Sequence, residues 1–377
     1  MEIIKYIIQK KSLRLSFLSY MNDDCNLEEK FHNLINDIEN LNISKNQEEF
    51  KSFLVFISKI SKNYYHTNDF FSKIEKILIF YQNEIKKYVS EEYLFTLFKG
   101  NKRIILFLIE EKILNIDDDS FFKLISKIDD CQFYLNYFFT EVSKFISKDS
   151  EKYAKNYSED FFKEKRKIGE NHSIICDMIR RDSIEEFTNF VNQKNYSLKT
   201  EVDLSIFETN LFLLKKNPTL IEYSAFFGSF NIFNYLCLNG VELTPSLWMY
   251  AIHGRDPEII SILEKKGIEP EDSTYLKCLK ESIKCFNDDF AIYFKFKMLQ
   301  RENGQILVNE SNFLENDAAY SFRYHNFCLL PENDTHKYMF FYLCFYNYIS
   351  LVKLYLQTKP VDINKSVNHP SLNDKQN

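Results

Sequence analysis

The chain has 377 residues, enough for two or three compact domains or for one elongated repeat array. Gly and Pro number only 7 each, whereas Phe (37) and Tyr (24) are plentiful, which argues against a sheet protein with many tight turns and favours a mostly helical one. The 48 basic and 54 acidic residues leave a net charge of −6, so the composition offers no basic surface for nucleic acid.

The sequence lacks the features of a secreted or membrane protein. Its N-terminus begins with an acidic residue and has no small-residue cleavage site, which argues against a signal peptide. The longest apolar run, Tyr338 to Ile349, is shorter than the ~20 residues that span a bilayer. The basic run from Lys163 to Lys167 favours a solvated helix face, with a nuclear address as the weaker alternative. We expect a cytoplasmic protein without membrane insertion.

Residues 1–155 are expected to form a helical N-terminal region that continues a solenoid and caps it. Apolar residues recur there at helical spacing, as at Phe50 and Phe53. This periodicity predicts four to seven helices. A boundary is expected near Ser147 to Asp160, where charged residues replace the apolar pattern.

A repeat is visible in the second half of the chain. An Asn-Pro pair is followed by a small residue, an Ile-x-x-x-Leu stripe and a Gly, and these residue types return 27 positions later (259 minus 232 for the isoleucines). A fixed offset of this kind is the signature of stacked repeats. The matched positions are Asn217 with Thr244, Pro218 with Pro245, Ser224 with Ala251, Ile232 with Ile259, Leu236 with Leu263 and Gly240 with Gly267.

Each matched position predicts one part of a helix-turn-helix unit. Asn217 and Thr244 are expected to cap the first helix, with a proline at its first position. The small residues let two helices approach closely, and the Ile and Leu residues place an apolar stripe on the second helix. Gly240 and Gly267 are expected to end that helix in a left-handed turn. One unit cannot bury its own apolar face, so neighbouring units must stack.

Weaker copies of the second-helix pattern extend the predicted array. We expect degenerate repeats over residues 160–296, an irregular or helical insertion over 297–337, a terminal repeat over 338–365 and a polar tail over 366–377. The copies begin at Gly100 (with Ile104 and Leu108), Ser183 (with Phe187 and Val191), Phe286 (with Phe290 and Phe294) and Asn347 (with Leu351 and Tyr355).

The stretch T-L-I-E-Y-S-A-F-F-G-S-F-N-I-F-N-Y-L-C-L-N-G-V-E-L resembles the ankyrin-repeat pattern T-P-L-H-x-A-A-x-x-G-x-x-x-I-V-x-x-L-L-x-x-G-A-x-V. Glu222 stands where the family usually has His. From about residue 5 to about residue 365, the chain resembles protist ankyrin-containing proteins with an associated domain of uncharacterised function. The matching residues are Thr219, Ile221, Ala225, Gly228, Ile232, Leu236 and Gly240.

The resemblance implies stacked helix pairs that bind other proteins. The period here is shorter than the roughly 33 residues of ankyrin repeats and leaves little room for a projecting β-hairpin. We therefore expect an all-α helical solenoid with few or no strands.

The sequence contains no common catalytic or nucleotide-binding motif. Two cysteines seven positions apart, Cys278 and Cys285, are expected to pack in the core. One group has residue types that bind zinc, but its spacing matches no common zinc frame. We therefore predict no catalytic, cofactor-binding or metal-binding residues. The residues of that group are His325, Cys328, His336 and Cys344.

The leading functional hypothesis is a non-catalytic adaptor or scaffold that binds an unidentified protein partner through its concave helix face and loop edge. The alternatives are an enzyme with an unrecognised site in the N-terminal helices, or a structural protein that self-associates through exposed aromatic residues. The residues expected to contact the partner are Asn239, Glu242, Arg255, Asp256, Lys265, Lys266 and Glu269.

Overall fold

The structure is a computed structural model that describes residues 2–22, 25–64, 69–128, 131–145, 157–299, 319–330 and 339–358. Its N-terminal half is built from helices joined by short turns. These are α1 (Glu2–Asn22), α2 (Leu27–Asn40), α3 (Gln47–Asn63), α4 (Phe70–Phe80), α5 (Gln82–Tyr88), α6 (Glu91–Phe98), α7 (Lys102–Glu110), α8 (Asp118–Ile125), α9 (Cys131–Tyr137), α10 (Phe139–Val142) and the 3₁₀ helix η1 (Ser143–Phe145).

The second half consists mainly of helix pairs. Its helices are α12 (Glu159–Ile168), α13 (Ile174–Arg180), α14 (Ile184–Lys194), α15 (Leu211–Leu214), α16 (Leu220–Phe226), α17 (Phe230–Leu238), α18 (Leu247–Gly254), α19 (Pro257–Lys265), α20 (Leu276–Lys284), α21 (Asp288–Leu299), α23 (Met339–Phe345) and α24 (Ile349–Thr358).

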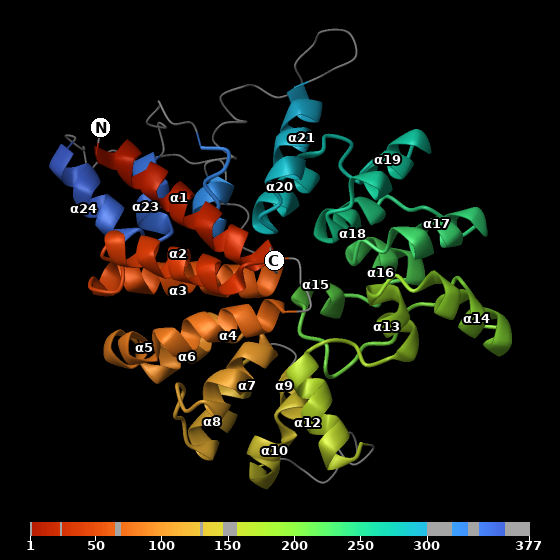
Figure 1. Ribbon diagram of the computed structural model, residues 1–377, viewed down its shortest axis with the longest axis horizontal. Helices are drawn as coiled ribbons and strands as arrows, with labels where there is room; N and C mark the ends of the chain where they lie inside the picture. Colours follow the sequence, from red (N-terminus) through yellow and green to blue (C-terminus); the bar gives the residue numbers. More distant parts are fainter. Residues whose placement is uncertain are drawn as a thin grey trace.

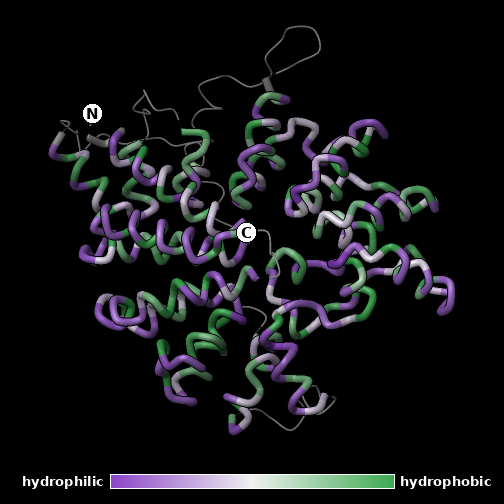
Figure 2. The backbone as a smooth tube through the Cα atoms, in the orientation of Figure 1, coloured by the Kyte–Doolittle hydropathy of each residue, from purple (hydrophilic) through white to green (hydrophobic). Residues whose placement is uncertain are grey.

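The expected helical class is confirmed for the residues that the structure describes. Their β-pairing is an isolated bridge between Glu201 and Thr219. No helix among them is long and apolar enough to cross a membrane. Figure 2 shows hydrophobic and hydrophilic residues interspersed along most helices, the pattern of helices that bury one face and expose another.

The helices follow one another around a ring (Figure 1), so that the last helix, α24, lies beside the first, α1. Helix α24 also contacts α3. A second contact between the two halves joins Arg14 of α1 to Asp288 of α21 in an ion pair. A third places the rings of Phe56 and Phe286 edge to face, with centroids 5.8 Å apart. The N-terminal helices therefore pack against the helix pairs of the second half.

Five helix pairs share one turn geometry. They are α13–α14, α16–α17, α18–α19, α20–α21 and α23–α24, and each has a residue with positive φ in the turn between its helices. In four of these turns the next residue donates its N–H to the carbonyl five positions back, as Ser229 does to Ser224 at 2.9 Å, which is the bond that closes a helix in a left-handed turn. The positive-φ residues are Asp182 (48°), Gly228 (64°), Arg255 (58°), Phe286 (56°) and Asn347 (61°), and the other three such N–H donors are Ser183, Asn287 and Tyr348.

The predicted helix ends of the matched units are confirmed, whereas their predicted starts are wrong. Gly240 and Gly267 have φ of 74° and 67° directly after α17 and α19. Helix α16, however, is capped by Thr219 rather than Asn217, because Glu222 three residues later completes a reciprocal capping box. Helix α18 begins after Ser246, without a cap from Thr244.

Gly254 explains how closely the first helices approach. A Cβ at Gly254 would lie 2.6 Å from the backbone nitrogen of Gly228 and would overlap the carbonyl oxygen of Ala225. Ser224 and Ala251, the small pair that the repeat predicted, are both fully buried. The backbones of α16 and α18 therefore meet directly, and only small residues fit between them.

The N-terminal region contains more helices than expected. Nine α-helices, α2 to α10, lie between residues 25 and 145 of the described chain. The apolar periodicity continues across the breaks between neighbouring helices, so it does not reveal them. Tyr81 ends α4 and begins α5, and Phe138 separates α9 from α10. The expected boundary at 147–160, the insertion at 297–337, the end of the terminal repeat and the tail at 366–377 lie wholly or largely outside the described residues.

Candidate interaction groove

The stacked helix pairs present two different edges. At the turn edge, the first helix of a pair passes into the second; at the loop edge, longer connections lead to the next pair. The connections between α17 and α18 and between α19 and α20 lie on the loop edge. Since α18 is 8 residues long, about 12 Å of helix separates the two edges.

The structure divides the seven predicted contact residues between these edges. Five of them are exposed at the loop edge, in or next to its connections. The other two, Arg255 and Asp256, are half-buried at the turn edge. The five at the loop edge are Asn239, Glu242, Lys265, Lys266 and Glu269.

Arg255 and Asp256 both make contacts within the chain. The Arg255 guanidinium donates to the carbonyl oxygens of Cys285 at 2.7 Å and Phe286 at 3.0 Å. Asp256 caps α19 by accepting from the backbone N–H of Glu258 at 2.7 Å. The Asp-Pro pair at the start of α19 is a sequence signal of this cap.

A groove of about 430 Å³ opens at the loop edge, at the N-terminal ends of α16 and α18. Its walls carry charges of both signs: Lys199 and Lys216 on the connections before α16, and Glu242 and Glu271 on the later ones. All four residues are exposed. Only Glu242 was among the predicted contact residues. The remaining lining residues are Thr219, Ile221, Glu222, Val241, Thr244, Pro245 and Ser246.

Glu222 fixes the relative position of the two helices that border the groove. One carboxylate oxygen, Oε2, accepts from the backbone N–H of Thr219 at 2.8 Å, and the other, Oε1, accepts from the Ser246 hydroxyl at 2.6 Å. The side chain is 3% exposed. Glu222 therefore caps its own helix and bonds to the next pair, from the position where the ankyrin pattern has His.

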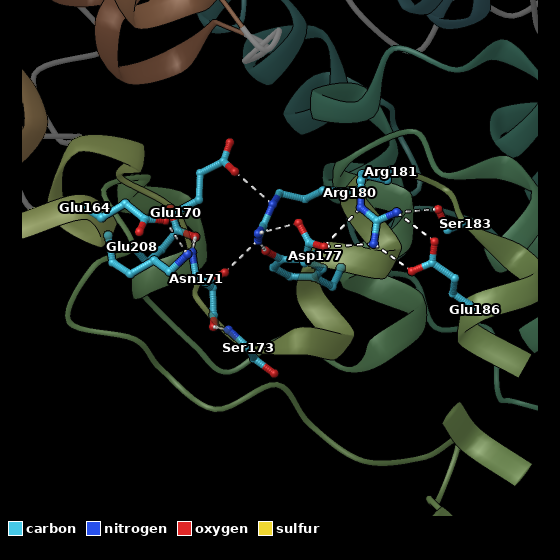
Figure 3. Close-up of polar contacts among 12 residues, drawn as sticks. Glu164, Glu170, Asn171, Ser173, Asp177, Arg180, Arg181, Ser183, Glu186 and Glu208 are labelled. Carbon is cyan, nitrogen blue, oxygen red and sulfur yellow. Dashed lines mark hydrogen bonds and ion pairs between the residues drawn. The ribbon is translucent and has the colours of Figure 1, made fainter. Parts of the chain in front are cut away.

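A polar network lies on the other side of α16 and holds α13 in place (Figure 3). Arg180 is ion-paired with Glu170 at 2.8 Å, and it donates to the backbone oxygen of Asn171 at 2.8 Å and to the Tyr223 hydroxyl at 2.9 Å. Burial raises the pKa of Glu170 despite the nearby guanidinium. Glu208 accepts from the backbone N–H of Asn171 at 3.3 Å, and burial raises its pKa to about 7.

This network is structural in its geometry. Arg180 joins the connection before α13 to Tyr223 on α16, and the side chains of Arg180 and Tyr223 are both largely buried. The neighbouring Arg181 lies on the solvent side, where it pairs with Asp177 and Glu186 (Figure 3). Tyr223 is next to Glu222 in α16, so the network anchors the helix that forms one wall of the groove.

The residues whose types suit zinc but whose sequence spacing matches no zinc frame lie in different surroundings. His325 is buried, with its ring 4.7 Å from that of Tyr348, whereas Cys344 is exposed on α23. His336 lies outside the described residues. Beside His325, between α1 and α3, is a cavity of only about 20 Å³, which has room for about one water molecule.

A different trio brings metal-binding side chains together. Among the described residues, His253, Glu281 and Cys285 are the group whose ligand atoms all lie within 4.8 Å of one another. Only part of this group could be predicted from the sequence: Glu281 on α20 and Cys285, which directly follows that helix, are four positions apart, whereas His253 lies in the preceding pair.

Comparison of the chain with protein-family models, with curated proteins and with solved structures gives no match in any of the three.

Proposed function

We propose that the chain is a non-catalytic protein-interaction module built on ankyrin-like helix pairs stacked as a curved solenoid. The recurrence of one positive-φ turn in five helix pairs supports the repeat assignment. The resemblance of residues 219–243 to the ankyrin pattern supports the same assignment. In solenoids of this kind, the extended surface formed by the repeats is the part that binds partners.

The groove at the loop edge is the observation that carries the proposal. It is bordered by two helix starts that Glu222 holds together, so it is present before a partner binds. Lys199 and Lys216 face acidic groups of the partner in this proposal, and Glu242 faces a basic one. A groove with charges of both signs suits an extended polypeptide segment better than a nucleic acid.

An apolar anchor lies at the same edge. Leu238, at the end of α17, is 79% exposed and is the most exposed large hydrophobic side chain of the described residues. It directly precedes Asn239, one of the predicted contact residues. Interfaces commonly combine a buried apolar anchor with a polar rim, and Leu238, on the same loop edge as the charged groove residues, fits that arrangement.

Site-specific photocrosslinking in the full chain tests the proposal. A photoreactive amino acid at position 242 places the probe in the groove, and the same amino acid at Lys163, exposed on α12, is the matched control. In lysate from the cells that make the protein, we expect one protein to be crosslinked from position 242 and not from position 163. Leu238→Asp should abolish that product. Identical crosslinked products from the two positions, or none from position 242, would contradict the proposal.

A further inference from the structure

His253, Glu281 and Cys285 lie where two neighbouring helix pairs meet. His253 is near the end of α18, and Glu281 and Cys285 are four residues apart on one face at the end of α20. All three are almost completely buried, with exposed fractions of 4%, 8% and 1%. The imidazole ring packs against Phe212 and Phe226, with centroids 4.4 and 4.8 Å away. These aromatic rings restrict the position of the imidazole.

The three potential ligand atoms have separations close to those of a metal site. The Nε2 atom of His253 is 2.9 Å from Oε1 of Glu281. The Cys285 sulfur is 3.6 Å from that nitrogen and 3.9 Å from that oxygen. In a tetrahedral Zn²⁺ site with ordinary bond lengths, the ligand atoms are about 3.4–3.6 Å apart. Each separation is therefore within about 0.5 Å of what the metal requires.

The contact between Cys285 and His253 is not a well-directed hydrogen bond. The sulfur is almost equally far from both ring nitrogens, at 3.5 Å from Nδ1 and 3.6 Å from Nε2. The sulfur therefore faces the imidazole ring rather than the lone pair of one ring nitrogen. Metal binding requires the imidazole to turn until the lone pair of Nε2 points between the sulfur and the carboxylate oxygen.

Lys284 is the competitor for this site. Its ammonium group is 2.6 Å from the same Oε1 atom of Glu281, and its side chain is 21% exposed. Without metal, the ammonium neutralises the buried carboxylate. With metal, the lysine can turn toward solvent, because it is the most exposed of the four side chains. Arg255 is also nearby but donates to the backbone carbonyl of Cys285 and leaves the sulfur available.

We propose that His253, Glu281 and Cys285 form a Zn²⁺ site that joins α18 to α20. The ligands are a neutral imidazole, a carboxylate and a thiolate, which together suit a divalent ion of intermediate softness. Binding breaks the Cys285 S–H bond heterolytically: the electron pair forms the sulfur–metal bond, and the proton passes to solvent. No electron transfer is involved. The two anionic ligands balance the charge of the ion, and water occupies the fourth position.

Titration of the full chain with Co²⁺, a spectroscopic substitute for Zn²⁺, tests the site. We expect one equivalent to produce the visible bands of tetrahedral Co²⁺ and a thiolate charge-transfer band in the near ultraviolet, both removed by added Zn²⁺. Cys285→Ser should abolish the charge-transfer band and weaken binding by more than about 100-fold. Cys278→Ser is the matched control, because Cys278 is a buried cysteine on the same helix; its spectrum should be unchanged.

A second variant tests the proposal without removal of a ligand. Lys284→Met deletes the competing ammonium group while it keeps a side chain of similar length. We expect about tenfold tighter Co²⁺ binding. A full chain without these bands, bands that survive in Cys285→Ser, or unchanged or weaker binding by Lys284→Met would each overturn the assignment.

Discussion

The guanidinium carbon of Arg255 lies 4.2 Å from the centroid of the Tyr64 ring, although the two residues are 191 positions apart. Arg255 occupies a left-handed turn with φ of 58°, the place that Gly228 has in the preceding pair. A non-Gly residue in this conformation is strained. Its side chain offsets that cost by contacts with Tyr64, Cys285 and Phe286. Arg255 therefore helps to close the ring.

Replacement of Arg255 by Ala should loosen this closure. It removes a cation–π contact and two hydrogen bonds to backbone carbonyls, so we expect a loss of about 1–3 kcal/mol in the free energy of unfolding. Urea denaturation measures the loss. A double-mutant cycle with Tyr64→Leu should give a coupling energy of about 1 kcal/mol. Additive effects of the two substitutions would show that the stacking contributes nothing.

Local sequence signals made the helix pairs predictable, whereas the arrangement of the helices in a ring could not be predicted from such signals. Gly240 and Gly267 end helices because of their own backbone freedom, so a repeat at fixed spacing was sufficient to predict them. The cap at Thr219 was missed although Glu222, three residues later, was a readable signal. Arg255 was assigned to the surface because Tyr64, its partner, lies in the other half of the chain. No local pattern predicts a contact across that distance.

Gly254→Ala should be more destabilising than its small volume implies. The added Cβ meets backbone atoms of Ala225 and Gly228, which cannot move without separation of α16 from α18. We expect a loss of about 2–3 kcal/mol in unfolding free energy. Gly240→Ala is the matched control, because its Cβ would meet nothing within 4 Å and only the positive φ is strained. Its loss should be about 1 kcal/mol, and thermal denaturation of the two variants compares them. Equal losses would contradict the close approach of the helices.

The two roles of Glu222 can be separated by substitution. Ser246→Ala removes the bond between neighbouring pairs and a local contact with the Thr244 hydroxyl at 2.8 Å, but it leaves the capping box of α16 intact, with an expected loss of about 1 kcal/mol. Glu222→Ala removes the bond to Ser246 and the capping box, and it leaves the backbone N–H of Thr219 at the start of α16 without its partner; we expect about 2–3 kcal/mol. Circular dichroism during urea denaturation gives both values. If Ser246→Ala were as costly as Glu222→Ala, the cap would have no separate contribution.

The last prediction concerns a lysine buried between the two halves of the chain. Lys102, at the start of α7, is 1% exposed; its ammonium group donates to the Ile206 carbonyl at 2.9 Å and lies 5.0 Å from the centre of the Tyr137 ring. Burial lowers its pKa to about 7, well below the ~10.4 of an unfolded chain. Burial also raises the pKa of Glu208 to about 7.

The sign of the pH dependence follows from these directions. Between about pH 7 and pH 10 the unfolded chain binds a proton at Lys102 that the folded chain does not, so stability should rise with pH in this window. Between about pH 4 and pH 7 the folded chain keeps a proton on Glu208 that the unfolded chain loses, so stability should fall as pH rises. Together the two groups favour a minimum in the free energy of unfolding near neutral pH.

Two variants separate these effects from the titration of other groups. From pH 7 to pH 9.5 the wild-type free energy of unfolding should rise, relative to that of Lys102→Met, by on the order of 3 kcal/mol. From pH 7 down to pH 4.5 it should rise relative to that of Glu208→Gln. Urea denaturation at the three pH values measures both differences. A constant difference between wild type and Lys102→Met would mean that the lysine keeps its proton when buried, with Tyr137 and the Ile206 carbonyl sufficient to stabilise the charge.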